Sequence, residues 1–125
     1  MSSLGVEPSV FSRIIAREIP ATIVAETDRV IAFEDIAPQA PVHVVITTKD
    51  PQYRNVVELA AGDAGLLAEL VRVARTIADE RTEGQFRLVF NTGAASGQTV
   101  FHVHAHILGV LGTADTLGEG SLGSL

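Results

Sequence analysis

The sequence predicts an α+β domain built on an antiparallel sheet, with helices packed on one side of it. β-Prone and helical segments do not alternate regularly along the 125 residues, as they would in a parallel doubly wound sheet. The composition, 46% hydrophobic and 19% charged, is typical of one globular domain with a substantial core. We therefore expect one domain over residues 11–109, between an N-terminal extension (1–10) and a flexible C-terminal tail (110–125).

The first part of the chain predicts a short helix followed by a hairpin. Residues 11–18 carry apolar side chains near helical spacing, and Pro20 ends this helix because the residue before a proline avoids the α conformation. Residues 22–26 and 30–34 are β-prone runs on either side of a short polar turn. This arrangement is typical of two antiparallel strands.

The middle of the chain predicts a loop, a strand and one long helix. Residues 35–41 contain two prolines and are expected to form a loop, and residues 43–47 are expected to form a buried strand. After Gly62 and Asp63, apolar residues follow at intervals of three and four. We expect Asp63 to cap this helix and residues 82–84 to end it.

The last third predicts two strands joined by a loop. Residues 86–91 are β-prone, and residues 92–99, which contain two glycines, are expected to form a flexible or ligand-wrapping loop. The histidine-rich run that begins at His102 then forms the final strand. Its apolar residues Val103 and Ile107 are expected to enter the core, because side chains alternate between the two faces of a strand.

Charge and composition disfavour several classes of function. The net charge of −6 argues against long nucleic acids, since phosphate neutralisation supplies most of that affinity, whereas backbone amides can still hold one small phosphorylated ligand. The sequence shows neither an apolar run of membrane-spanning length nor a basic and apolar leader segment. The absence of cysteine excludes disulfides and cysteine-ligated zinc. We expect a cytoplasmic protein.

Three of the four histidines, His102, His104 and His106, stand at alternate positions in one β-prone run. Because alternate side chains of a strand share a face, we expect three imidazoles along one surface or pocket. Imidazole acts near neutral pH as a nucleophile, an acid, a base or a metal ligand. Residues 96–99, just before the run, offer backbone N–H groups, a hydroxyl and an amide to a phosphate.

Three interpretations of these residues stay open. The histidines are surface or core side chains without a chemical role, or they hold zinc or iron with His43, a carboxylate or water as a further ligand. In the third interpretation they carry out nucleophilic and acid–base chemistry at phosphorus, which needs no metal. We favour the third, because no acidic residue lies within the run.

The histidine run and its surroundings resemble a known family. Residues 96–109, including His102-Val103-His104-Ala105-His106, resemble the signature of the histidine triad (HIT) family and are most similar to its branch of purine nucleoside phosphoramidases. Residues 11–21 resemble the opening helix of that family, and residues 32–43 its strand and proline-rich loop. The resemblance implies a five-stranded antiparallel sheet with one short and one long helix, and a homodimer in which two sheets form one continuous sheet.

The resemblance also implies an activity, the hydrolysis of purine nucleoside 5′-phosphoramidates without a metal or another cofactor. His104 is implied to attack the α-phosphorus and to carry the nucleoside monophosphate until water releases it. His106 is implied to contact the phosphate and the leaving group, and His102 and His43 to support the site by hydrogen bonding. The implied partners are a purine nucleoside monophosphate or its amide and a second copy of the chain, with no nucleic acid polymer and no membrane.

The nucleotide pocket is implied residue by residue. Asp35 is implied to hold the ribose hydroxyls, because a carboxylate accepts hydrogen bonds from paired hydroxyls. The implied walls of the base site are apolar: Phe11, Ile14, Phe33 and Ile36. The implied phosphate contacts are Asn91, Gly97, Gln98 and Thr99.

The sequence departs from the family pattern at several positions. Thr99 stands where relatives commonly carry serine, and Glu34, which borders the implied ribose region, stands where they often carry histidine. The residues after Gly109 lack the second glycine and the basic residue that usually follow, which leaves the preferred leaving amine open. Two alternative functions also stay open, hydrolysis of dinucleoside polyphosphates and nucleotide binding with little turnover.

Overall fold

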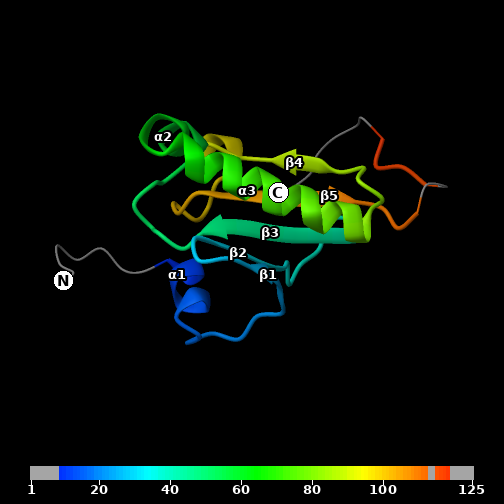
Figure 1. Ribbon diagram of the computed structural model, residues 1–125, viewed down its shortest axis with the longest axis horizontal. Helices are drawn as coiled ribbons and strands as arrows, with labels where there is room; N and C mark the ends of the chain where they lie inside the picture. The colour runs from blue at the N-terminus through cyan, green and yellow to red at the C-terminus, as the bar shows by residue number, and fades with distance from the viewer. Residues whose placement is uncertain (1–8, 113–114, 119–125) are drawn as a thin grey trace.

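The computed structural model describes residues 9–112 and 115–118, which form a five-stranded antiparallel sheet in the order β1-β2-β3-β5-β4 (Figure 1). This confirms the predicted α+β fold and its antiparallel sheet. The strands are β1 (Ile23–Glu26), β2 (Val30–Glu34), β3 (Val42–Thr48), β4 (Arg87–Val89) and β5 (His104–Gly109). The helices are α1 (Val10–Ile15), α2 (Val56–Gly62) and α3 (Ala64–Arg81), with a 3-10 turn at Ala94–Ser96.

The main core lies between α3 and one face of the sheet (Figure 1). As predicted, Asp63 caps α3, and its Oδ1 accepts a hydrogen bond from the backbone N–H of Leu66 at 3.0 Å. The helix buries a stripe at intervals of three and four, which consists of Leu66, Leu70, Ala74, Ile77 and Ala78. The predicted apolar row of β5 faces this helix, and Val103, Ala105 and Ile107 are fully buried.

The short helix α1 corrects one expectation, because it packs on the face of the sheet opposite α3. Phe11 and Ile14 of α1 form a separate apolar cluster with Phe33 of β2 and Val45 of β3. Their strand neighbours, such as Ala32 and Val44, belong to the core under α3, as the alternation of side chains along a strand requires. The second face of the sheet is thus only partly covered, which leaves room for a site beside α1.

Helix α1 is also shorter than predicted and begins earlier. Ser9 is its N-cap, and Ala16 follows its last residue. Arg17 then takes a left-handed backbone conformation with φ 62°, and its N–H donates to the Ile14 carbonyl. The chain therefore leaves the helix three residues before Pro20. Ser9 and Val10, assigned by the sequence analysis to the extension, take part in α1.

A helix that is not predicted from the sequence, α2, precedes α3. Asn55 caps it through a hydrogen bond from the N–H of Glu58 at 2.9 Å, and Asp63, whose backbone is not helical, separates it from α3. Only Leu59 of this helix is buried, and Val57 is 65% exposed. A single buried residue produces no apolar stripe, so the helical period was not visible in the sequence.

The flexible tail expected over residues 110–125 lies partly outside the described residues, and the described positions 110–112 and 115–118 form neither helix nor strand. Most of the expected N-terminal extension, residues 1–8, also lies outside them. Among the described helices, none combines the length and the apolar character needed to cross a lipid bilayer.

Candidate active site

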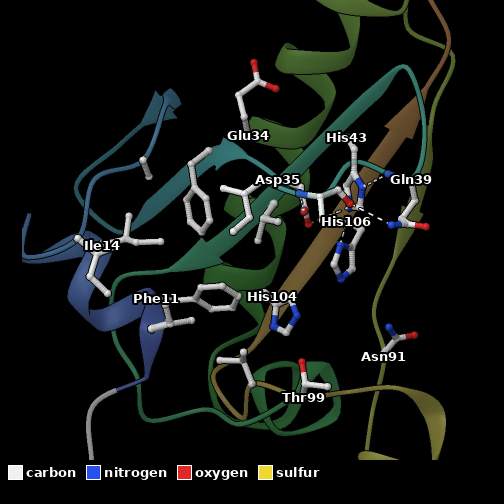
Figure 2. A pocket seen from close by; sticks show the side chains of 18 of the residues that line it. Phe11, Ile14, Glu34, Asp35, Gln39, His43, Asn91, Thr99, His104 and His106 are labelled. Atoms are coloured by element: carbon white, nitrogen blue, oxygen red, sulfur yellow. Dashed lines mark hydrogen bonds and ion pairs between the residues drawn. The ribbon is translucent and has the colours of Figure 1, made fainter. Parts of the chain in front are cut away.

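A cavity of about 820 Å³ lies on the partly covered face of the sheet, beside α1 (Figure 2). Its apolar side is formed by α1 and the strands β2 and β3. Its polar side is formed by β5, the 35–41 loop, His43 near the start of β3 and the loop before β5. The apolar lining includes Val10, Phe11, Ile14, Ile19, Phe33, Ile36, Val45 and Val100. The polar lining includes Asp35, Gln39, His43, Asn91, Ser96, Thr99, His104 and His106.

His104, the first residue of β5, is held so that one ring nitrogen is available. Its Nδ1 lies 2.9 Å from the carbonyl oxygen of His102, so Nδ1–H donates and Nε2 keeps its lone pair. The ring of Phe11 packs edge-on against it, with a centroid separation of 4.7 Å. Burial lowers the pKa of His104, which leaves the imidazole neutral at pH 7. A neutral imidazole that lines a cavity is a competent nucleophile.

His43 and His106 form a hydrogen-bonded pair whose protons can be assigned. The backbone N–H of Gln39 donates to Nδ1 of His43 at 2.9 Å, so the neutral His43 carries its proton on Nε2. That Nε2 lies 2.9 Å from Nδ1 of His106, which must accept (Figure 2). The proton of neutral His106 is therefore on Nε2. His106 thus presents a donor beside His104, its ring centroid 5.3 Å from that of His104.

The environment keeps this pair neutral in the free protein. Burial, followed by the nearby imidazoles of His104 and His43, lowers the pKa of His106 to about 4, although Asp35 opposes the shift. Burial also lowers the pKa of His43, again against the attraction of Asp35. A negatively charged ligand in the cavity would favour the imidazolium form of His106.

Asp35 links the proline-rich loop to the histidine pair. Its Oδ1 accepts the N–H of Ala37 at 2.7 Å, and its Oδ2 lies 3.4 Å from Nε2 of His43. Within the described chain, Asp35, His43 and His106 place ligand atoms within 4.8 Å of one another and could hold a metal ion. Hydrogen bonds among these groups and to the backbone already account for their arrangement.

His102 lies just before β5, and its ring is enclosed rather than part of the cavity lining. Its Nε2 lies 2.6 Å from the carbonyl oxygen of Thr48 and therefore carries the proton. Its Nδ1 accepts from the hydroxyl of Ser9, the residue that caps α1, at 2.8 Å. The ring is 1% exposed. The expected row of three imidazoles in one pocket is thus reduced to two, His104 and His106.

The loop before β5 is fixed from within by Gln98. The Gln98 Oε1 accepts the N–H of Gly93 at 2.8 Å, and its Nε2 donates to the carbonyls of Arg54 and Val100. Gly97 has φ 101°, which favours glycine and lets the backbone turn beside the cavity. The side-chain amide of Gln98 is buried and bonded to these backbone groups, so it lies behind the cavity lining, and its expected contact with phosphate stays a prediction.

Comparison with known proteins identifies the family of this chain. The family model described as "Scavenger mRNA decapping enzyme C-term binding" matches residues 8–119, and solved HIT proteins share the fold. The chain belongs to the histidine triad family. A HIT family hydrolase from Clostridium thermocellum superimposes with a TM-score of 0.79 at 42% identity, covering 90% of this chain and 99% of that one. This similarity makes the protein a hydrolase at the level of the family.

Two relatives define its place within the HIT family. A HIT-like protein of Synechococcus elongatus is 49% identical over 105 residues, which cover 82% of this chain and 90% of that protein. The purine nucleoside phosphoramidase of Escherichia coli is 41% identical over 105 residues, which cover 82% of this chain and 87% of that enzyme. The protein thus falls in the same branch of the HIT family as the purine nucleoside phosphoramidases, as the sequence resemblance indicated.

The structure brings most of the predicted residues to the HIT cavity. Eleven of the thirteen lie in its lining: Phe11, Ile14, Phe33, Asp35, Ile36, His43, Asn91, Gly97, Thr99, His104 and His106. Their roles toward a nucleotide stay predictions. His102 and Gln98 lie behind the lining and act on other residues. Glu34 also lines the cavity, and its carboxylate binds Arg81 of α3 at 2.8 Å, so its expected position beside the ribose stays a prediction (Figure 2).

Several residues of the HIT site are not predicted from the sequence. Gln39 acts through its backbone N–H, which no side-chain motif can reveal. Val45 and Ile19 have the apolar pattern of core residues and were not distinguished from them. Ser9 stands next to Pro8 before an apolar helix, which is a recognisable capping position. Its hydrogen bond to His102, 93 positions away, has no local signal.

Proposed function

We propose that this HIT protein hydrolyses purine nucleoside 5′-phosphoramidates in two steps, with His104 as the nucleophile. The purine lies against the apolar side of the cavity, with Phe11, Ile14 and Phe33. Asp35 accepts hydrogen bonds from the ribose hydroxyls. The phosphate lies at the loop of residues 93–99, near Asn91 and the backbone of Gly97. The proposal rests on the 41% identical phosphoramidase and on the lone pair assigned to His104 Nε2.

In the first step, Nε2 of His104 attacks the α-phosphorus and the P–N bond to the amine breaks. A proton passes from the imidazolium form of His106 to the departing nitrogen, so the amine leaves neutral. The anionic phosphate beside the ring stabilises that imidazolium, which explains how a group with a pKa of about 4 in the free protein can act as the acid. The nucleoside monophosphate is then bonded to His104.

In the second step, water attacks the phosphorus and gives a proton to the neutral His106. The bond from phosphorus to Nε2 of His104 breaks, and nucleoside monophosphate leaves. His104 returns to its neutral form and His106 to its imidazolium, so the cycle balances. His43 holds the His106 ring in place through the 2.9 Å hydrogen bond in the free protein.

The charge of the cavity favours this substrate over a dinucleoside polyphosphate. Neither lysine nor arginine occurs among the described lining residues, and Asp35 adds a negative charge. Backbone N–H groups and imidazoles therefore meet the charge of the phosphate. A phosphoramidate monoester places one negative charge there, whereas a polyphosphate places several adjacent charges, each less well compensated.

Steady-state hydrolysis of adenosine 5′-phosphoramidate, with diadenosine tetraphosphate as the competing substrate, tests the proposal. We expect turnover of the phosphoramidate to persist in EDTA and to disappear in His104→Asn. We expect His106→Gln to lower kcat by about 10²–10⁴-fold, the usual contribution of general acid–base catalysis. Thr76→Ala, an exposed position of α3, is the matched control and should keep the wild-type rate.

Each other outcome contradicts a different part of the proposal. Unchanged turnover in His104→Asn excludes that residue as the nucleophile. Faster hydrolysis of the tetraphosphate makes the substrate class wrong. Binding of adenosine monophosphate without any turnover by the wild type identifies a nucleotide-binding protein, and loss of activity in EDTA identifies a metal-dependent one.

A further inference from the structure

We propose that Ser9 is a positioning residue for the catalytic strand, because its hydroxyl joins the start of α1 to the buried ring of His102. The hydroxyl proton has two acceptors within reach, His102 Nδ1 at 2.8 Å and Ser12 Oγ at 3.4 Å, and the imidazole is the nearer. The same oxygen accepts the N–H of Ser12 at 3.0 Å and caps the helix. Ser9 thus serves two elements that lie 93 positions apart.

The proton assignment makes this contact specific. Nε2 of His102 donates to the Thr48 carbonyl at 2.6 Å, so Nδ1 can only accept while the ring is neutral. Ser9 is therefore a required donor. A buried acceptor that loses its donor costs free energy, and an imidazole has a second response, which is to take up a proton.

The consequence reaches His104 through the backbone. The carbonyl of His102 holds Nδ1 of His104 at 2.9 Å and thereby leaves Nε2 as the nucleophilic atom. Tilting of the His102 ring would move that carbonyl. Protonation of the ring would place a positive charge beside His104 and make its lone pair less basic. Tilting and protonation of the His102 ring would therefore both make Nε2 of His104 a poorer nucleophile.

The surroundings of His102 favour the neutral ring. Burial lowers its pKa, although the Thr48 carbonyl and the carboxylate of Asp50 oppose the shift. On the α1 side, the rings of Phe11 and His102 pack edge-on, with a centroid distance of 5.9 Å. His104 is the other titratable group that interacts with it electrostatically in the described chain. A neutral His102 with a hydroxyl donor is therefore the state that the native packing selects.

Three substitutions separate the capping role from the positioning role. Ser9→Ala removes both the cap and the donor. Ser9→Asp keeps an oxygen for the N–H of Ser12, since aspartate caps helices as well as serine does, but it cannot donate to His102 while ionised. Ser9→Thr keeps both functions and is the conservative control. Thr76→Ala, at an exposed position of α3 outside the cavity lining, controls for unrelated surface changes.

The readouts are the Tm, the kcat for adenosine 5′-phosphoramidate and the ¹⁵N NMR signals of the His102 ring in full-length protein. We expect Ser9→Asp to keep the wild-type Tm but to protonate Nδ1 of His102. We expect kcat to fall about five- to tenfold in Ser9→Ala and Ser9→Asp, the effect of one lost hydrogen bond, and to recover in Ser9→Thr. Wild-type kcat in Ser9→Asp, or an unchanged His102 signal in both variants, overturns the proposal.

The kcat readout rests on the proposed function, but the NMR readout does not. If the wild type hydrolyses no phosphoramidate, the proposed function fails while the His102 signals still report on Ser9. If turnover is normal and the His102 ring signals are unchanged in the Ser9 variants, the proposed function stands and the positioning role of Ser9 is wrong. The two failures are therefore distinguishable in one set of samples.

Discussion

The buried histidines should make the stability of this protein depend steeply on pH. His106 illustrates the effect, because its pKa is lowered from an ordinary value of 6.5 to about 4. Between pH 6.5 and about pH 4, the His106 ring therefore binds a proton in the unfolded chain but not in the folded chain. The stabilisation from the neutral ring is therefore fully present above pH 6.5 and is lost as the pH falls toward 4.

The size of the loss follows from these two values. One pKa unit corresponds to about 1.36 kcal/mol, so the complete effect of His106 is roughly 3 kcal/mol, and a change from pH 8 to pH 5 removes about 2 kcal/mol. Burial lowers the pKa of His43, His102 and His104 in the same direction, which adds to the loss. A typical domain has only about 5–15 kcal/mol of stability, so the difference is easily measured.

Urea unfolding at pH 8 and pH 5 is the assay, with wild type, His106→Gln and Gln85→His compared. A glutamine at position 106 can still accept the hydrogen bond from His43, and it does not titrate. We expect this variant to lose about 2 kcal/mol less than the wild type between the two pH values. Gln85→His adds an exposed imidazole and should leave the difference unchanged. An equal loss in His106→Gln and the wild type would refute the reasoning.

Three further predictions follow from the structure, and a fourth from the family resemblance. A Cβ at Gly109 would lie 2.4 Å from Cγ2 of Thr82, so Gly109→Ala should destabilise the fold by about 1–3 kcal/mol, and Thr82→Ser should relieve this in urea unfolding. Gln98→Leu leaves three backbone groups without partners and should raise KM for the phosphoramidate, whereas unchanged kinetics and stability would contradict its bracing role. The acid limb of kcat/KM should lie below pH 6.5, because burial lowers the pKa of His104. A homodimer is expected from the family resemblance, and sedimentation equilibrium that gives a monomer would contradict it.

The sequence was informative wherever a pattern had one structural solution. The alternation of Val103, Ala105 and Ile107 with histidines allows a single placement, apolar side inward, and the structure has it. The spacing of apolar residues after Asp63 likewise specified α3 and its cap. The signature of the HIT family added the location of the cavity, which periodicity alone does not provide.

Other features depended on tertiary contacts and could not be read from local pattern. The side of the sheet on which α1 packs is decided by Phe33 and Val45, and neither residue differs in type from its core neighbours. His102 was expected beside the other two imidazoles because a strand was assumed to begin there. The chain instead bends at that residue, and hydrogen bonds to Thr48 and Ser9 enclose its ring.

The proton positions were the least predictable part of the site. They depend on which atoms surround each ring nitrogen, such as the Gln39 N–H beside His43, and a sequence contains no such information. These assignments nevertheless decide the chemistry, because they leave a lone pair on His104 Nε2 and a donor on His106 Nε2. The roles of the two residues follow from that difference.

The most direct test of the account is to capture the covalent intermediate during turnover. Wild-type protein is mixed with adenosine 5′-phosphoramidate, quenched in base within milliseconds and analysed by peptide mass spectrometry, with ³¹P–¹⁵N coupling in labelled protein to identify the bonded atom. We expect one adenylyl group, attached to Nε2 of His104. An adenylyl group on another residue or on Nδ1 would contradict the account, as would turnover without any intermediate.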